Sequence, residues 1–205
     1  MIGSMTSYPG DAPLPYNEDW LFRGLPDREI ASYGVAKLAA LQMLRAYRAE
    51  FELRSACAIL VNLYGPGDNV DDPHRSHAAG ALMKRFVEAA DQGLGEVVCW
   101  GTGAPTRDFL YIDDAAEGVL RCVEAVDDAG AVNIARGQET SIRELTELMA
   151  RLAGYRGRVV WDESKGDGVS RRCLDITRAR ALGWAPRVGL EEGLRRTMAG
   201  YRARR

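Results

Sequence analysis

The sequence predicts an α/β fold built on a parallel sheet. Helix-like and strand-like segments alternate along its 205 residues, which is the order that strand-helix-strand units require. One apolar run, ACAILVNLYG at residues 56–65, has the length of a strand and no regular alternation of polar residues. This pattern is typical of a parallel strand buried on both faces. Hydrophobic residues make up 46% of the chain, so it can bury a core of ordinary size.

Composition and charge narrow the function classes. The net charge of -2 provides no basic excess for nucleic acid or for an anionic membrane. No apolar run reaches the roughly 18 residues of a membrane span, and no signal-like segment follows Met1. We therefore expect a cytoplasmic protein that binds neither nucleic acid nor a membrane.

The cysteines and histidines form no metal-binding pattern. They show no CxxC pair and no ligand spacing between the two residue types, so we expect buried free thiols in a reducing compartment and no metal. The residues are Cys57, Cys99, Cys122, Cys173, His74 and His77.

The first 51 residues predict a short strand, a long loop and a helix. Ile2-Gly3-Ser4 has the pattern of a strand end, and residues 8–30 are rich in proline, glycine, asparagine and aspartate, as in an irregular connection. Loops of this length inside compact domains are usually functional. From Ser32 to Phe51, apolar positions follow helical spacing.

The alternation continues to the end of the chain. We expect Asp113-Asp114 to cap one helix, and Ser141 with Glu144 to form the capping box of another, which ends near Gly154. The predicted elements are a strand at 56–64, a helix at 77–93, a strand at 96–103, a strand leading into a helix at 109–126, a strand at 131–135, helices at 141–157 and about 189–202, and a strand at 159–164 followed by a polar loop at 164–172.

Tyr33 and Lys37 are the first chemical signal. Four residues apart on a helix, they lie on one face about one turn apart. An ammonium near a phenol favours the phenolate, so such a tyrosine can exchange a proton with a sugar or alcohol oxygen near neutral pH. The same pair also occurs by chance on solvated helix faces, so the spacing alone leaves that interpretation open.

The surroundings of this pair resemble a known family. The order SxxxYP, long loop, YGVAK and buried strand ending NLYGPGDN is similar to the extended short-chain dehydrogenase/reductase (NAD-dependent epimerase/dehydratase) family, whose members modify nucleotide sugars. Further segments are most similar to its GDP-L-fucose synthase branch, the 3,5-epimerase/4-reductases of GDP-4-keto-6-deoxymannose. They are SHAAGALMKRF, EVVCWGTGAPTRDFLYIDDAAEG, AVNIARGQETSIRELTELMA, GYRGRVVWDESKGDG and RCLDITRARALGW.

The resemblance implies catalytic roles for four residues. Tyr33 would protonate the 4-oxygen of the sugar, Lys37 would stabilise the phenolate and hold the cofactor ribose, and Ser4 would hydrogen-bond the same sugar oxygen. His77 would be a second acid/base that reprotonates a ring carbon and would also lie at the cofactor. Without the resemblance, His77 is a loop histidine at a helix start.

The resemblance also implies binding residues. Asn62, Leu63 and Tyr64 follow the buried strand, where ligands of parallel sheets bind, and would lie beside the nicotinamide of NADP or NAD. Guanidinium groups pair well with phosphate, and an indole offers a flat face to a ring. The implied contacts of the nucleotide sugar, with GDP favoured, are Arg85, Trp100, Arg107 and Asp167.

Two positions depart from the branch. Thr6 stands where the branch has the cysteine that serves as the base in epimerisation, and a hydroxyl is a poor base for a carbon acid. Leu60-Val61 stand where the branch typically has Pro-Thr. Both changes leave open a nucleotide-sugar 4-epimerase, whereas a 4,6-dehydratase is disfavoured because Thr6-Ser7 is followed by Tyr8.

The resemblance further implies a division of the chain. Residues 1–70 would be the remaining C-terminal part of a Rossmann domain, and 71–205 mainly a smaller α/β substrate-binding domain, with about 108–127 returning to the Rossmann part. The family's TGxxGxxG cofactor motif does not occur, since WGTGAP and YGPGDN have only GxG. We therefore expect a missing N-terminal half, present in the complete protein or supplied separately, and a chain that is inactive alone.

Two classes of function stay open. The first is the catalytic and substrate-binding part of an NAD(P)-dependent epimerase/reductase, which as a complete protein would form a homodimer. The second is an inactive remnant that binds a nucleotide sugar or pairs subunits through the helices at 33–50 and 77–91.

Overall fold

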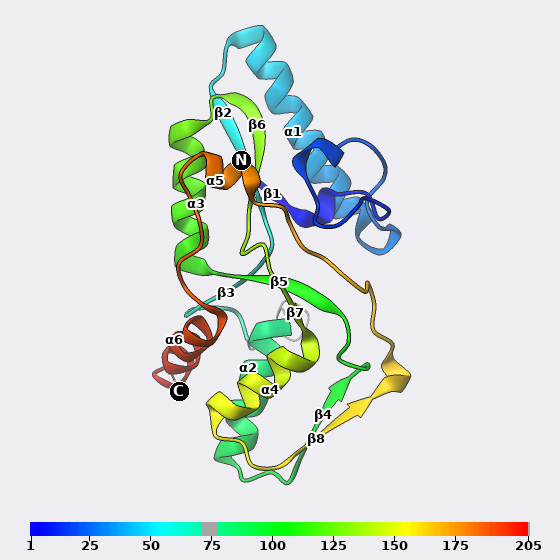
Figure 1. Cartoon of the computed structure of the whole chain (residues 1–205), viewed down its shortest axis with the longest axis vertical. Coiled ribbons are helices and arrows are strands. Elements are labelled where there is room, and N and C mark those ends of the chain that lie inside the picture. Colours follow the sequence, from blue (N-terminus) through cyan, green and yellow to red (C-terminus); the bar gives the residue numbers. More distant parts are fainter. Residues whose placement is uncertain (71–77, 205) are drawn as a thin grey trace.

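The computed structural model describes residues 1–70 and 78–204, and it confirms the α/β fold with parallel strands (Figure 1). The strands are β1 Ile2–Ser4, β2 Ser55–Leu60, β3 Asn62–Tyr64, β4 Glu96–Trp100, β5 Thr106–Tyr111, β6 Asp128–Ile134, β7 Glu139–Ser141 and β8 Arg158–Asp162. The α-helices are α1 Ala31–Phe51, α2 Ala78–Asp91, α3 Ile112–Ala125, α4 Ile142–Ala153, α5 Thr177–Ala181 and α6 Leu190–Arg202. Single 3-10 turns are η1 Met5–Ser7, η2 Glu18–Trp20, η3 Arg28–Ile30 and η4 Glu163–Lys165.

A three-stranded parallel sheet forms one end of the molecule. Its strand order is β1-β2-β6, with Gly3 opposite Ile59 and Ile59 opposite Asn133. Figure 1 shows α1 and α3 on the two sides of this sheet, and both helices contact its strands. Because the strands are covered on both faces, β2 is almost continuously apolar.

The apolar run at 56–65 forms two strands rather than the single strand that its pattern predicts. β2 pairs with β1 and β6, whereas β3 pairs in parallel with β5 in a second sheet. The amide of Asn62 donates to the carbonyl of Asp108 at 3.0 Å, which holds the chain after the change of sheet. Hydrophobicity cannot reveal this change, since both strands are equally apolar.

The remaining strands lie toward the other end of the molecule (Figure 1). β5 pairs with β7 in antiparallel orientation, and β4 pairs in parallel with β8. Helices α2, α4 and α6 pack against one another beside them. The short α5 and β7 have no periodic pattern long enough to predict them from the sequence.

The buried hydrophobic residues form two clusters. One contains residues of β2, β6, α1, α3 and α5 together with residues of the loop after β1, and the other contains residues of α2, α4, β4, β5 and α6. β5 contributes Leu110 to the first cluster and Phe109 to the second. The predicted domain boundaries at 70 and about 108–127 stay a prediction, and the segment from 128 to 135 also packs in the first cluster.

The predicted N-terminal cap is confirmed for α4 and is wrong for α3. Ser141 and Glu144 form the predicted capping box of α4, and Gly154 ends that helix with a φ of 77°, a conformation that glycine adopts without strain. The predicted cap by Asp113 and Asp114 is wrong, because Tyr111 is the N-cap of α3.

The two aspartates lie instead in the first turn of α3. There they suit the positive end of the helix dipole. The buried Asp114 carboxylate also accepts hydrogen bonds from the backbone N–H groups of Arg187 and Val188 at 3.1 and 2.9 Å. Asp114 therefore holds in place the backbone of the segment that leads into α6.

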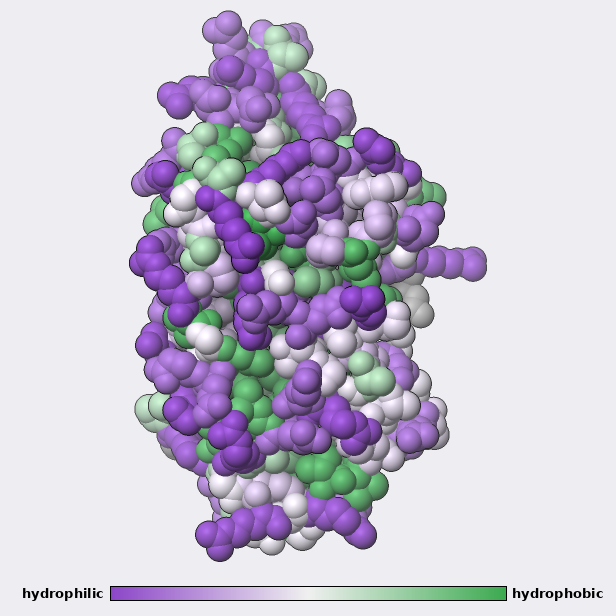
Figure 2. Space-filling model, viewed as in Figure 1, coloured by the Kyte–Doolittle hydropathy of each residue, from purple (hydrophilic) through white to green (hydrophobic). Residues whose placement is uncertain are grey.

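Polar side chains cover most of the face drawn in Figure 2, and apolar atoms form a few separate patches. All four cysteines are buried free thiols, as predicted. Within residues 1–70 and 78–204, no helix has the length and apolarity that a membrane crossing requires. Met43, Tyr47 and Phe51 are exposed on α1, one of the helices expected to pair subunits, and that pairing stays a prediction.

Candidate active site

Ser4 ends β1 at the carboxyl edge of the parallel sheet. Its Oγ accepts a hydrogen bond from the backbone N–H of Thr6 at 3.3 Å and lies 2.9 Å from the Thr6 hydroxyl. Both side chains are half-buried. Thr6 is therefore a hydrogen-bonding neighbour of Ser4, and its hydroxyl has none of the acid-base character of a thiol.

Tyr33 and Lys37 lie in the first two turns of α1, beside the strand end that carries Ser4. Lys37 Nζ donates to the carbonyl oxygen of Ile2 at 3.1 Å and lies 5.4 Å from the centroid of the Tyr33 ring. The Tyr33 side chain is 55% exposed, so its hydroxyl is accessible to a ligand. Lys37 thus contacts both the Tyr33 ring and the strand whose last residue is Ser4.

The fourth predicted catalytic residue, His77, lies outside the described residues. Its predicted role at the ring carbon and at the cofactor stays a prediction. The same holds for the start of the helix at 77, since α2 is described from Ala78.

Gly34 allows α1 to approach the segment after β1. A Cβ added at Gly34 would lie 2.3 Å from the carbonyl oxygen of Thr6 and 2.8 Å from Pro26. The hydroxyl of Ser7 lies 3.4 Å from the Gly34 carbonyl oxygen in the same contact. Close packing at this glycine therefore sets the separation between Tyr33 and Ser4.

Replacing Gly34 with alanine is expected to lower the free energy of unfolding by about 1–3 kcal/mol, because the methyl group overlaps the backbone of Thr6. Alanine is the better helix former by about 1 kcal/mol, so helix propensity alone predicts the opposite sign. Chemical denaturation followed by circular dichroism decides between the two. Unchanged or increased stability would contradict this packing.

Asn62, Leu63 and Tyr64 form β3. Leu63 and Tyr64 line a cavity of about 200 Å³ together with residues 65–68 and Ile112. Tyr64 is buried, which raises the pKa of its hydroxyl, and its ring packs edge-on against Tyr111. Asn62 is not among the residues that line this cavity, and its amide donates to the carbonyl of Asp108, so its side chain supports the fold.

Three of the predicted nucleotide-sugar contacts lie around the end of β4. Arg85 donates to the carbonyl of Val98 at 2.7 Å, and Trp100 is 67% exposed. The Asp167 carboxylate accepts hydrogen bonds from the N–H and the hydroxyl of Thr102 at 2.7 and 2.6 Å, and these bonds lower its pKa. These bonds hold Asp167 beside Thr102, two residues after Trp100.

The fourth predicted contact, Arg107, lies on β5 in a different cavity. This cavity measures about 580 Å³ and is also lined by Asp27, Arg28 and Arg172. Burial and the nearby positive charge of Arg172 lower the pKa of Arg107. A half-buried guanidinium beside another cation is a favourable place for an anion.

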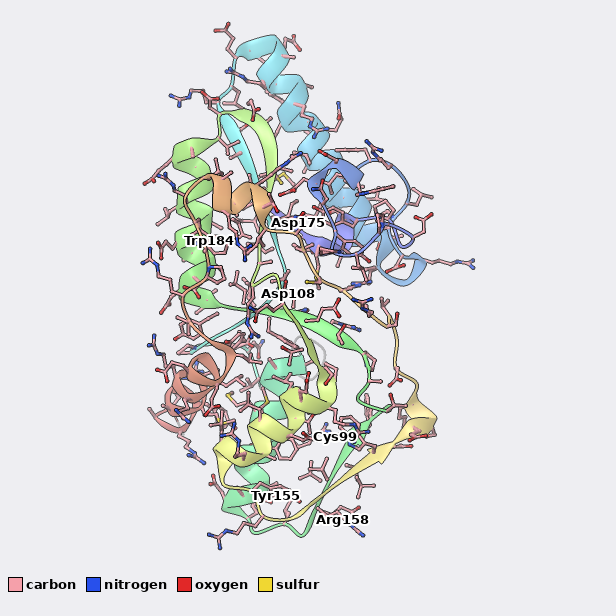
Figure 3. All side chains as sticks on the ribbon, in the orientation of Figure 1. Cys99, Asp108, Tyr155, Arg158, Asp175 and Trp184 are labelled. Atoms are coloured by element: carbon pink, nitrogen blue, oxygen red, sulfur yellow. The ribbon has the colours of Figure 1, made fainter. Side chains whose placement is uncertain are left out.

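Asp108, next to Arg107, joins three segments near the middle of the molecule (Figure 3). Its fully buried carboxylate accepts hydrogen bonds from the N–H groups of Arg136 and Gly137 at 3.0 and 2.9 Å, and the Cys173 thiol lies 3.7 Å away. Burial raises its pKa to about 6, although these hydrogen bonds act in the opposite direction.

The raised pKa of Asp108 gives stability a defined pH dependence. Because the carboxyl binds its proton more tightly in the folded state, it stabilises the fold below about pH 4 relative to its effect above pH 6. Relative to Asp108→Asn, the free energy of unfolding of the native chain is expected to rise by about 3 kcal/mol as the pH falls through this window. Urea unfolding of both proteins at several pH values measures the difference, and a constant difference would contradict it.

A buried polar network fastens the loop that follows β1. Asn133 on β6 accepts from the Tyr8 hydroxyl at 2.6 Å and donates to the carbonyls of Tyr16 and Asp175 at 2.9 Å each. Its own N–H donates to the buried Glu18 carboxylate at 2.8 Å. Tyr8 stacks on Tyr16 with ring centroids 5.1 Å apart. The long loop is therefore tied to the sheet rather than free.

Sequence reasoning missed Asp27, Arg172, Asp108 and Asn133. Arg172 lies in a segment that its polarity predicts to be an exposed loop, yet it is 8% exposed. The consecutive charges of Arg107-Asp108 and the single asparagine in AVNIA are the only sequence signals, and neither indicates a partner. Within the described part of the chain, no three histidine, cysteine or acidic side chains form a cluster suited to a metal.

The fold, with Tyr33 and Lys37 one turn apart on α1, agrees with the family that a comparison with family models finds. The model of the NAD dependent epimerase/dehydratase family matches residues 1–135. The chain belongs to this family.

Within the family, the chain is similar to GDP-L-fucose synthases. It is 40% identical over 200 residues to "Probable GDP-L-fucose synthase 1" of Oryza sativa subsp. japonica, covering 98% of this chain and 61% of that protein. The chain thus spans about three fifths of the length of this relative.

Solved structures have the same fold. A GDP-6-OMe-4-keto-L-xylo-heptose reductase from C. jejuni superposes with a TM-score of 0.91 at 24% identity, covering 100% of this chain and 70% of that one. RMD from Pseudomonas aeruginosa, complexed with NADPH, has a TM-score of 0.84 at 25% identity, covering 100% and 66%.

Proposed function

We propose that the chain carries the proton-donating and sugar-binding part of an NAD(P)-dependent reductase of GDP-4-keto-6-deoxy sugars. The observation that carries this proposal is the contact of Lys37 with both the Ile2 carbonyl and the Tyr33 ring, at the strand end that bears Ser4. The identity to GDP-L-fucose synthases over nearly the whole chain supports the nucleotide and the reaction.

In the proposed reaction, the Tyr33 hydroxyl donates its proton to the 4-oxygen of the sugar as negative charge develops there. The Lys37 ammonium, 5.4 Å from the centroid of the Tyr33 ring, would stabilise the resulting phenolate. The Ser4 hydroxyl hydrogen-bonds the same oxygen and fixes its position. When bound, NADPH or NADH supplies the hydride for the 4-carbon.

The residues present fit the nicotinamide end of such a cofactor. The cavity of about 200 Å³ is lined by Leu63, Tyr64, residues 65–68 and Ile112, and it is open beside Gly67, where an added Cβ would meet no atom within 4 Å. Lys37 would hold the ribose. The complex of a solved relative with NADPH supports the cofactor class, and the predicted absence of the main cofactor-binding half stays a prediction.

For the sugar nucleotide, we propose Arg107 as the diphosphate contact and Arg85, Trp100 and Asp167 as contacts at the end of β4. This assignment follows the proposed division into a Rossmann part at 1–70, to which about 108–127 return, and a mainly substrate-binding part at 71–205. Thr6 contributes no thiol base, so reduction without 3,5-epimerisation is the reaction that these residues favour.

The test uses the protein expressed from its full open reading frame. It is incubated with GDP-4-keto-6-deoxymannose and NADPH, and the loss of NADPH absorbance is followed, with NADH and with UDP- and dTDP-linked 4-keto sugars as comparisons. We expect consumption with the GDP-sugar. If none of these sugars consumes NADPH or NADH, the reductase proposal is wrong.

A further inference from the structure

The cavity around Arg107 lies between the turn that leads into the Tyr33 helix and the start of β5. Its volume is about 580 Å³, and its lining contains Arg28, Arg107 and Arg172 with a single acid, Asp27. Asp27 and Arg28 lie directly before α1, whereas Arg172 comes from the segment after η4. Three distant parts of the sequence therefore build one cationic cavity.

In this cavity Arg172 has an acidic partner, whereas Arg107 has none among the described residues. Asp27 accepts from the Arg172 guanidinium at 2.6 Å, and the Arg172 side chain is only 10% exposed. Arg107 donates to its neighbouring carbonyl on Thr106 at 2.8 Å, and among the described residues no carboxylate lies within ion-pair distance of it. Arg107 is thus a half-buried cation beside a second cation whose charge Asp27 offsets.

The backbone holds Arg172 in this place. Arg172 N–H donates to the Thr106 carbonyl at 3.3 Å, and the next residue, Cys173, accepts from the N–H of Tyr16 at 2.8 Å. The buried phenol of Tyr16 interacts electrostatically with Arg172, Asp27 and Arg107. The Asp27 carboxylate is more exposed than its partner, at 28% against 10%, so it is the member that can turn away.

We propose that Asp27 is the resident counter-ion of this cavity, which holds the Arg172 guanidinium beside Arg107 and yields it to the diphosphate of a ligand. The inference rests on the proposed function for the nature of that ligand. It adds Arg172 as a second diphosphate-binding guanidinium and Asp27 as a residue that positions it and competes with the ligand.

The two partners then have opposite effects on anion binding. Removing the charge of Asp27 eliminates repulsion of the ligand and leaves Arg172 as uncompensated as Arg107, so the anion binds more tightly. Removing the charge of Arg172 leaves an acid facing the ligand, so the anion binds more weakly. For charges several ångströms apart near a protein surface, each effect amounts to about 5- to 30-fold in Kd.

Isothermal titration of the protein from its full open reading frame with pyrophosphate tests this inference. We expect Asp27→Asn to lower the Kd for pyrophosphate and Arg172→Met to raise it, each by about 5- to 30-fold. GDP is titrated in parallel. If the two variants shift the Kd for both ligands equally and GDP binds more tightly than pyrophosphate, the site binds a nucleotide diphosphate. If pyrophosphate binds and GDP does not, the site binds the free anion, and the nucleotide part of the inference is wrong.

The chain offers a matched control in a second ion pair. Arg178 pairs with Asp19 and also links the loop at 8–30 to the segment after Asp175, but neither residue lines the cavity. Asp19→Asn and Arg178→Met are expected to leave the Kd for pyrophosphate within about two-fold. If Asp27→Asn weakens binding or leaves it unchanged, the counter-ion role is wrong.

A measurement on the unmodified protein guards against variants that do not fold. In an NMR titration with pyrophosphate, the side-chain Nε–H signal of Arg172 is expected to shift, and that of Arg178 is expected to stay in place. An unmoved Arg172 signal in the presence of bound pyrophosphate overturns the inference. None of these readouts needs turnover, so the reductase proposal and this one fail independently.

Discussion

Replacing Tyr33 with phenylalanine is expected to lower kcat for reduction of the GDP-4-keto sugar by about a hundred- to ten-thousand-fold, the range that a positioned general acid contributes. The phenyl ring keeps its place beside Lys37. Tyr33 is 55% exposed, and its hydroxyl makes none of the hydrogen bonds that stabilise the fold among the described residues. KM and the free energy of unfolding should therefore change little. Steady-state kinetics and denaturation on the same preparation separate these effects.

Tyr47→Phe is the matched control for this prediction. Tyr47 lies on the same helix, and its side chain is 48% exposed, so the variant also loses one accessible phenol. We expect unchanged kcat. An equal loss in both variants, or none in Tyr33→Phe, would show that Tyr33 is not the acid.

Replacing Asn133 with leucine is expected to lower the free energy of unfolding by about 3–5 kcal/mol. The substitution leaves the Tyr8 hydroxyl and the carbonyls of Tyr16 and Asp175 without their buried partner, and each such group costs about 1–3 kcal/mol. The loop at 8–30 should loosen first, because these bonds tie it to β6. Urea denaturation gives the magnitude, and hydrogen exchange gives the location.

Two comparisons check the Asn133 network. Tyr8→Phe removes one of the three bonds and should cost about 1–2 kcal/mol, and a double-mutant cycle with Asn133→Leu gives their coupling. Gln92→Leu also exchanges an amide for leucine, but at an exposed position, and should be neutral within about 0.5 kcal/mol. If Asn133→Leu is as mild as Gln92→Leu, the network does not fasten the loop.

The sequence predicted the helices, caps and strands that depend only on residues close together in the chain. The helix from Ser32 to Phe51, the capping box of α4 and the buried strand β2 follow from periodicity, capping residues and uninterrupted apolarity. The change of sheet after Leu60 could not be predicted this way, because pairing partners depend on residues far along the chain. Asp114 likewise serves backbone groups 73 and 74 positions away.

The candidate site likewise contains residues that the sequence indicates and residues that only the fold reveals. Tyr33 and Lys37 are detectable because helix geometry alone brings them together. Arg172 and Asp27 are 145 positions apart, and Asp108 joins segments near residues 136 and 173. Only the folded chain shows that these charges are buried and paired.

Transfer of deuterium from labelled NADPH to the sugar tests the central claim most directly. The protein from its full open reading frame is incubated with GDP-4-keto-6-deoxymannose and NADPH carrying deuterium at the reactive carbon, and the product is analysed by NMR. The proposed function predicts one deuterium at carbon 4 of a GDP-6-deoxyhexose. Recovery of unreduced sugar, or of a product without deuterium at carbon 4, would contradict it.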